Sequence, residues 1–87
     1  MMRTNLVYLV VWEVTFDRWE GYALADDDGY VLAYVKGETP EQVWFELEKF
    51  DQRFLQHYPD GYDTLRLTFE EAERHHGYQK AYNKNRL

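Results

Sequence analysis

The sequence predicts a small α+β protein with the order β-β-β-α-β-α, in which an antiparallel-rich sheet packs one long helix on one face, and a short helix follows at the C-terminus. Four segments alternate apolar and polar residues as half-buried strands do, one long segment repeats apolar residues at helical spacing, and two capping boxes mark helix starts. With 87 residues and no linker or repeat, we expect a single domain over residues 1–87.

The segment "NLVYLVVWEVTF", residues 5–16, predicts an interior strand. Its even-numbered residues form one continuous apolar face, and Val7, Leu9 and Val11 make the first half of the other face apolar as well. We expect the long helix to cover the even-numbered face. The patch of Val7, Leu9 and Val11 is then left for the C-terminal helix or for a second copy of the chain, and we favour a homodimer.

Residues 18–26 and 29–36 predict the second and third strands, with Gly21 as a candidate bulge. The link between them ends in Asp28-Gly29, which is a strong hairpin signal. Glycine adopts positive φ, and an aspartate side chain can bond to its own backbone. These two residues are therefore explained by the turn without any functional role.

The segment "ETPEQVWFELEKFDQRFLQHY" predicts one long helix over residues 40–57. Thr39 is a suitable N-cap, Pro40 occupies the first helical position, and Gln42 completes a capping box. Apolar residues then recur at i, i+4, i+7 and i+11, which predicts a stripe that packs on the sheet. Its members are Val43, Leu47, Phe50 and Phe54.

The C-terminal part predicts a fourth strand at residues 64–69 and a short helix. Thr68 and Glu71 form a second capping box at the start of this helix, and Gly77 limits its length. We expect the basic tail, about residues 78–87, to fray. Its alternating tyrosines and lysines are compatible with binding single-stranded nucleic acid, but we favour bases that complement the helix dipole.

The composition excludes several chemistries. The chain has no cysteine and no serine, so disulfides, thiolate–zinc sites and serine or cysteine nucleophiles are impossible. No glycine-rich phosphate loop or paired-carboxylate motif is present. We therefore expect a protein that is not an enzyme, with no cofactor and no metal. We interpret His57, His75 and His76 as solvated histidines at helix ends, although His57 or His75 as a general base remains an alternative.

The charge is unevenly distributed along the chain. Residues 1–73 contain six basic and 16 acidic residues, a net charge of −10, whereas residues 74–87 contain four basic residues and no acid. An acidic body repels nucleic acid and attracts basic surfaces. We expect a protein partner and no direct nucleic acid binding. The apolar run near the N-terminus is too short for a signal or a membrane span, which favours a cytoplasmic protein.

Residues 21–50 resemble the β-β-α core of HicB-like antitoxins. The stretch "GYALADDDGYVLAYVKGETPEQV" is similar to the strand pair of that family, followed by its G-x-T-x-E-E-A helix start. In size, acidity and aromatic content, the chain also resembles small phage inhibitors of the anti-CRISPR and DNA-mimic class. Both resemblances imply a non-enzymatic inhibitor that masks the basic surface of a nucleic-acid-handling protein, such as a nuclease or a CRISPR effector. The alternative is a homodimeric structural or adaptor module.

In the inhibitor hypothesis, acidic side chains take the place of phosphates, and neighbouring tyrosines serve as anchors. The three consecutive aspartates are the most conspicuous candidates, although their residue chemistry by itself favours a solvated hairpin turn over a partner contact. A metal site is disfavoured, because adjacent side chains on an extended segment point to opposite sides. The expected partner-binding residues are Glu20, Tyr22, Asp26, Asp27, Asp28, Tyr30, Glu38 and Glu41.

Overall fold

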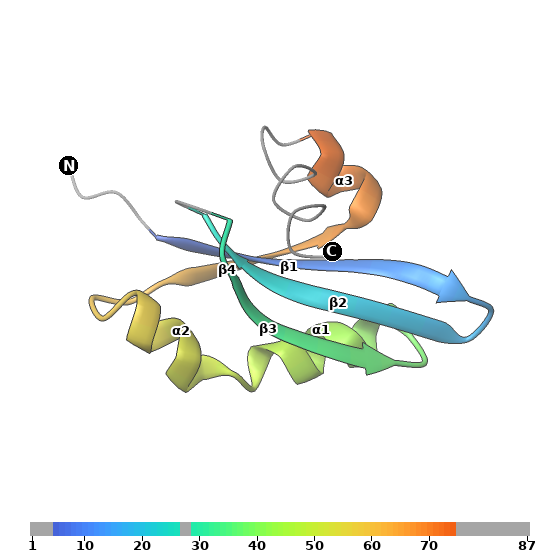
Figure 1. Cartoon of the computed structure of the whole chain (residues 1–87), viewed down its shortest axis with the longest axis horizontal. Coiled ribbons are helices and arrows are strands. Elements are labelled where there is room, and N and C mark those ends of the chain that lie inside the picture. The colour runs from blue at the N-terminus through green and yellow to red at the C-terminus, as the bar shows by residue number, and fades with distance from the viewer. Residues whose placement is uncertain (1–4, 27–28, 75–87) are drawn as a thin grey trace.

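The computed structural model describes residues 5–26 and 29–74 (Figure 1). The α+β class and the strand-rich N-terminal half agree with the prediction. The elements in chain order are β1 (Leu6–Thr15), β2 (Arg18–Ala25), β3 (Val31–Gly37), α1 (Pro40–Glu48), α2 (Asp51–His57), β4 (Asp63–Thr68) and α3 (Phe69–Arg74).

The four strands form one mixed sheet with the order β3-β2-β1-β4. β1 pairs antiparallel with β2, and β2 pairs antiparallel with β3. β4 joins the other side of β1 in parallel, with Tyr8 opposite Leu65. A parallel neighbour requires a crossover, and α1 and α2 supply it beneath the sheet (Figure 1). β1 is therefore an interior strand, as its apolar pattern predicts.

The prediction that the helix covers the even-numbered face of β1 is wrong. Val7, Leu9 and Val11 are fully buried and belong to the same core as the helix residues. The helix residues of this core are Val43, Leu47 and Phe54, with Phe50 packed at its margin. The patch of Val7, Leu9 and Val11, from which we predicted a homodimer, is thus covered by the chain's own helices.

A second, smaller core lies on the opposite face of the sheet. It joins Tyr8 and Val10 of β1 to Leu24 of β2, Leu67 of β4 and Ala72 of α3. The first half of β1 is apolar on both faces, so its alternation could not decide which face the long helix would take. The choice depends on the neighbouring strand.

Gly21 of β2 makes the close approach of α1 possible. A Cβ atom added to this residue would lie 2.5 Å from Cγ1 of Val43, well inside ordinary van der Waals contact. Gly21 is not the predicted bulge, because it pairs regularly with Val11 and Val35. Glycine is needed here because the backbone of β2 meets the helix. Gly29, by contrast, has the positive φ of 70° that the hairpin signal predicts.

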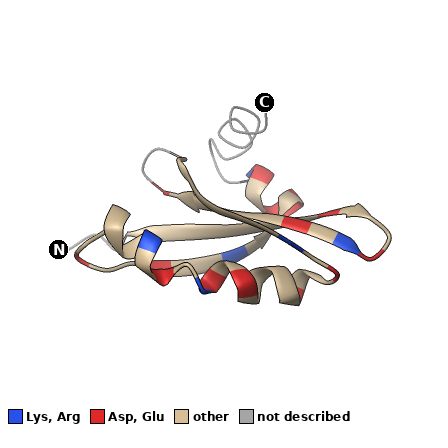
Figure 2. Cartoon of the chain, turned by 60° about the horizontal axis from the view of Figure 1, so that its bottom comes forward, with Lys and Arg blue, Asp and Glu red and all other residues tan. Residues whose placement is uncertain are grey.

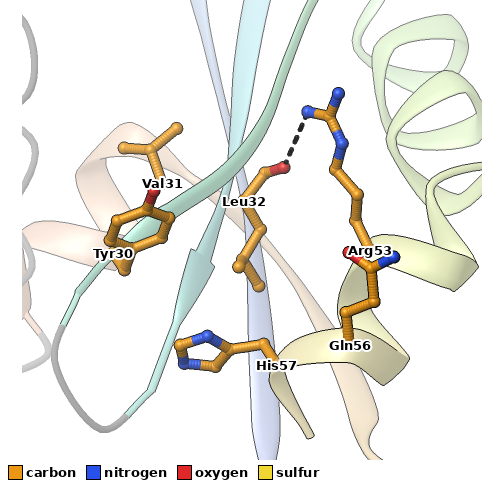
Figure 3. A pocket seen from close by; sticks show the side chains of 6 residues that line it. All are labelled: Tyr30, Val31, Leu32, Arg53, Gln56 and His57. Atoms are coloured by element: carbon orange, nitrogen blue, oxygen red, sulfur yellow. Dashed lines mark hydrogen bonds between the residues drawn. The ribbon is translucent and has the colours of Figure 1, made fainter.

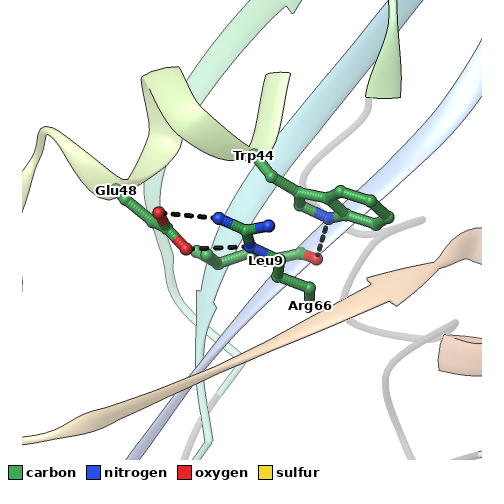
Figure 4. Close-up of polar contacts among 4 residues, drawn as sticks. All are labelled: Leu9, Trp44, Glu48 and Arg66. Atoms are coloured by element: carbon green, nitrogen blue, oxygen red, sulfur yellow. Dashed lines mark hydrogen bonds and ion pairs between the residues drawn. The ribbon is translucent and has the colours of Figure 1, made fainter. Parts of the chain in front are cut away.

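Polar contacts tie side chains of α1 to the backbone of β1 and to a side chain of β4 (Figure 4). The indole Nε1 of Trp44 donates a hydrogen bond of 3.0 Å to the carbonyl oxygen of Leu9. The guanidinium group of Arg66, on β4, lies 5.7 Å from the centre of the Trp44 ring. The same guanidinium makes two hydrogen bonds of 2.9 Å to the carboxylate of Glu48. These contacts link α1 to β1 and to β4.

The predicted long helix is divided into α1 and α2. The amides of Lys49 and Phe50 donate to the carbonyls of Glu46 and Leu47, each three residues back, which tightens the last turn of α1. Phe50 then leaves helical geometry with ψ of 34°. After this break, Phe54 still reaches the main core. The apolar spacing is therefore satisfied by two short helices.

The capping box at the start of α3 is confirmed, because the amides and side chains of Thr68 and Glu71 exchange both of its hydrogen bonds. At the start of α1 only half of the predicted box forms. The hydroxyl of Thr39 accepts from the amide of Gln42, but the side chain of Gln42 accepts from the amide of Glu38, one residue before the cap. The predicted end of the last helix at Gly77 and the basic tail lie outside the described residues.

Candidate protein-binding surface

The structure separates the predicted partner-binding residues into two groups at opposite ends of β2. Glu20 lies near the start of this strand and Asp26 directly follows its end. Six residues of extended chain span roughly 20 Å. Tyr30 begins the return towards β3 at the Asp26 end. The predicted residues therefore do not form one compact cluster at the described positions, and we describe the two ends separately.

The first end is formed by the tip of the β1–β2 hairpin. β4 pairs with β1 only as far as Val11, and β3 pairs with β2 only from Trp19 onwards. The hairpin tip therefore extends past both neighbouring strands, as Figure 1 shows. Every residue from Glu13 to Arg18 is exposed. The turn itself is fixed by Asp17, which adopts a left-handed backbone conformation with φ of 56°.

The start of α1 lies beside this hairpin. Trp19 pairs with Gly37 across β2 and β3, and the helix begins three residues later. This pairing brings Glu38 and Glu41 to the same end of the molecule as Glu20. We call this region the hairpin end. Its acidic residues are Glu13, Asp17, Glu20, Glu38 and Glu41, and its basic residues are Arg18 and Lys36 (Figure 2).

Among the described residues, the carboxylates of the hairpin end have no basic group within ion-pair distance, although Glu41 is near enough to Arg66 to contribute to its raised pKa. Lys36 stands opposite Glu20 across the sheet, yet these two described residues form no ion pair. Acids further along α1 differ in this respect. Glu46 pairs with Lys49 at 3.0 Å and Glu48 pairs with Arg66 at 2.9 Å. Negative potential is consequently concentrated at the hairpin end.

The second end contains an open cleft of about 420 Å³ between the start of β3 and α2 (Figure 3). The ring of Tyr30, 60% exposed, stacks on His57 with 6.1 Å between ring centres. Nη1 of Arg53 donates a 3.4 Å hydrogen bond to the carbonyl of Leu32, and its guanidinium lies over the ring of Phe50. Both basic residues of the cleft thus make contacts within the chain.

His57 is more enclosed than a solvated helix-end histidine. It is half-buried, and its ring meets that of Tyr58 edge-on at 4.7 Å in addition to the stack on Tyr30. Asp26 is also half-buried, and its amide donates to the carbonyl of Leu6. Asp27, Asp28, His75 and His76 lie outside the described residues.

A second cleft, of about 480 Å³, opens between α2 and the segment that leads into β4. Its lining includes Glu48, Asp51 and Asp63, together with Tyr62, whose hydroxyl donates to the carboxylate of Asp51. Burial and this contact with Asp51 raise the pKa of Tyr62 to about 12. Within residues 5–26 and 29–74, no group of three or more histidine or carboxylate side chains is arranged to hold a metal ion.

Tyr22 belongs to neither end, because it lies mid-strand on the sheet face that α3 partly covers. Its ring stacks against Trp12 with 5.2 Å between centres and meets Tyr34 at 4.9 Å. These three rings run across β1, β2 and β3, and Tyr34 is 41% exposed. Tyr22 is thus the middle ring of an aromatic row that crosses the sheet.

Phe16 is a surface residue that the sequence pattern did not indicate. Its even position places it in the apolar face of β1, so a buried ring was expected, yet 89% of it is exposed. None of the helices in the described part of the chain covers the tip of the hairpin. The adjacent Asp17 was the available signal, since it indicates a turn at this point. Phe45, 59% exposed on α1, was detectable because it lies opposite the stripe of Val43 and Leu47.

Comparison with protein-family models, with curated proteins and with solved structures finds no match for this chain. Within the described residues, no helix has the length and apolar character needed to cross a bilayer. Function has therefore to be argued from the surface itself.

Proposed function

We propose that this protein is a non-enzymatic inhibitor that binds through its acidic hairpin end and masks the basic surface of a nucleic-acid-handling protein, such as a nuclease or a CRISPR effector. The observation that supports this most directly is the gathering of five carboxylates that lack ion-pair partners among the described residues. Such a cluster attracts a basic surface over several ångströms and accelerates its association.

Folding accounts for only part of this concentration of charge: Glu41 in the first turn of α1 complements the helix dipole, whereas Glu13 and Glu20 lie on strands, where no helix dipole acts on them. Like charges held close together repel and lower stability. The acids in the middle of α1, Glu46 and Glu48, are paired with basic side chains, so this chain does neutralise carboxylates elsewhere. Unpaired carboxylates at one end are therefore better explained by complementarity to a partner. The resemblance of residues 21–50 to the antitoxin core supports a partner of the same kind.

The test begins with isolation of the partner from the native cell and continues with a competition assay. The purified chain should displace DNA or RNA from the partner at a 1:1 ratio, and a chelator should not change the result. An acidic partner that handles no nucleic acid contradicts the proposal. So does turnover of the partner or of its nucleic acid at substoichiometric amounts.

Two triple variants locate the interface. Glu20→Gln, Glu38→Gln and Glu41→Gln together remove three charges from the hairpin end. The matched control, Asp26→Asn, Asp27→Asn and Asp28→Asn together, removes three charges from the segment that follows β2 in the sequence and keeps a turn-competent sequence. Both variants change the net charge from −6 to −3. Differences between them therefore report position and not total charge.

We expect the hairpin-end variant to lose about 10- to 100-fold in affinity, mainly through a slower association rate, and to show a weaker dependence on salt. The aspartate variant should lose less, and both should melt near the parent temperature. A larger loss in the aspartate variant moves the interface to the Asp26 end. Unchanged affinity in both variants at low and high salt refutes recognition through acidic residues.

A further inference from the structure

The hairpin end has an apolar residue at its apex. Phe16 is 89% exposed, and the neighbouring Val14 on β1 is also exposed. No strand other than β1 and β2 pairs with this part of the chain, and the φ of 56° at Asp17 fixes the turn that presents the ring. An aromatic ring held outwards on a two-stranded support is pre-organised for insertion into a cavity, because little conformational entropy is lost on binding.

We propose that Phe16 is the apolar anchor of the interface and inserts into an apolar pocket on the partner protein, while a rim of lysine and arginine residues around that pocket meets Glu13 and Asp17. This inference rests on the proposed function and adds a specificity-determining residue to it. Interfaces commonly combine a central aromatic anchor with a polar rim. The tip of the hairpin has this composition.

The charges around Phe16 argue for a basic protein over two other occupants. Glu13 and Asp17 beside the ring outnumber the single basic residue there, Arg18, so an anionic membrane surface would repel the tip on balance. A second copy of the chain would bring its own net charge of −6 to the contact. A pocket with a basic rim accommodates both the ring and the carboxylates, so we commit to a protein of that kind.

Phe45 is a suitable control for Phe16. It is also exposed, at 59%, but its surroundings within the chain account for it. The ammonium group of Lys49 lies 4.8 Å from the centre of the Phe45 ring and pairs with Glu46. Replacing either phenylalanine should leave folding intact, because neither belongs to the two cores. Thermal melts of both variants verify this.

The experiment combines photo-crosslinking with affinity measurement. Benzoylphenylalanine is placed at position 16 in one full-length chain and at position 45 in another, and each chain is irradiated in lysate of the native cell. The crosslinked partner peptide is then identified and the partner purified.

We expect the crosslink from position 16 to fall in an apolar pocket flanked by lysine or arginine, and the crosslink from position 45 to be absent or to fall elsewhere. Phe16→Ala should weaken binding to the purified partner at least tenfold, and Phe45→Ala less than threefold.

Several outcomes overturn the anchor. These are no crosslink from position 16, a crosslinked product of two copies of the chain, a pocket without basic residues, or equal losses for Phe16→Ala and Phe45→Ala. Binding of the parent chain, but not of Phe16→Ala, to vesicles of phosphatidylcholine with phosphatidylserine would assign the ring to a membrane and overturn it too.

Different results would refute the anchor role of Phe16 and the proposed inhibitor function. If the hairpin-end glutamine variant loses affinity and Phe16→Ala does not, the electrostatic function stands and the anchor is wrong. If Phe16→Ala alone loses affinity for a partner that handles no nucleic acid, the anchor stands and the proposed function is wrong.

Discussion

Gly21→Ala is the most direct test of how the helices pack on the sheet. The new Cβ atom would lie 2.5 Å from Cγ1 of Val43, about 0.9 Å inside an ordinary contact of 3.4 Å. Val43 is fully buried and β-branched, so its side chain cannot rotate away easily. The same Cβ atom would lie 3.1 Å from the carbonyl oxygen of Val10, which belongs to the sheet backbone. The helix has to shift to accept the substitution.

The expected loss of stability follows from two opposing effects. Overpacking a core costs about 1–3 kcal/mol. Alanine in place of glycine within a strand returns roughly 0.5–1 kcal/mol, because the unfolded chain has less freedom to lose. We expect a net loss of about 1–2 kcal/mol, which lowers the melting temperature by about 5–15 °C for a domain of this size.

A double-mutant cycle with Val43→Ala identifies the cause. Val43→Ala alone removes the Cγ atoms and destabilises the core. In that background, Gly21→Ala should cost at least about 0.5 kcal/mol less than it does in the parent, since the closest contact no longer exists. Urea unfolding of all four proteins gives the coupling energy. An identical cost in both backgrounds, or a stabilising effect of Gly21→Ala in the parent, would refute the placement of α1 against Gly21.

Two further predictions concern polar contacts at the surface. Burial and the hydrogen bond to Asp51 raise the pKa of Tyr62 from 10.0 to about 12, so its stabilising contribution is complete below pH 10 and is lost as the pH rises towards 12. Urea unfolding at about pH 9 and pH 11.5 should therefore show a larger fall for the parent than for Tyr62→Phe, and equal falls would contradict the raised pKa. Arg66 and Glu48 are partly exposed, at 48% and 34%, so Glu48→Gln should cost less than about 1 kcal/mol, and less still in high salt. A loss above 2 kcal/mol in urea unfolding would show that this bridge is not an ordinary surface ion pair.

Local features of this fold were predictable because the interactions that produce them span only a few residues. The capping box of Thr68 and Glu71 is an example, since both bonds close within one helical turn. The positive φ of Gly29 follows from the Asp-Gly pair in the same way. The helical stripe was also recognised correctly, as Val43, Leu47 and Phe54 are all buried.

The choice of sheet face and the break in the long helix were decided by tertiary structure. The first half of β1 is apolar on both faces, so two arrangements satisfy its pattern equally well. The absence of a side chain at Gly21 provides the space that α1 occupies, and Gly21 and Val43 are 22 residues apart in the sequence. The apolar periodicity of a sequence describes one helix or strand at a time, whereas the packing of α1 against Gly21 depends on both α1 and β2.

The sequence by itself determined the strongly acidic character of the protein and excluded cysteine and serine chemistry, because both follow from composition. Only the tertiary structure decided which acids lie at the same end of the molecule. The pairing of Trp19 with Gly37 brings Glu20 and Glu38 to one end, while the length of β2 keeps Asp26 at the other. Likewise, alternation along β1 predicted a buried Phe16, and its exposure arises because the hairpin continues beyond the neighbouring strands. The physical reason is the same in both cases: burial and proximity depend on what stands beside a strand, and the strand's own sequence does not contain that information.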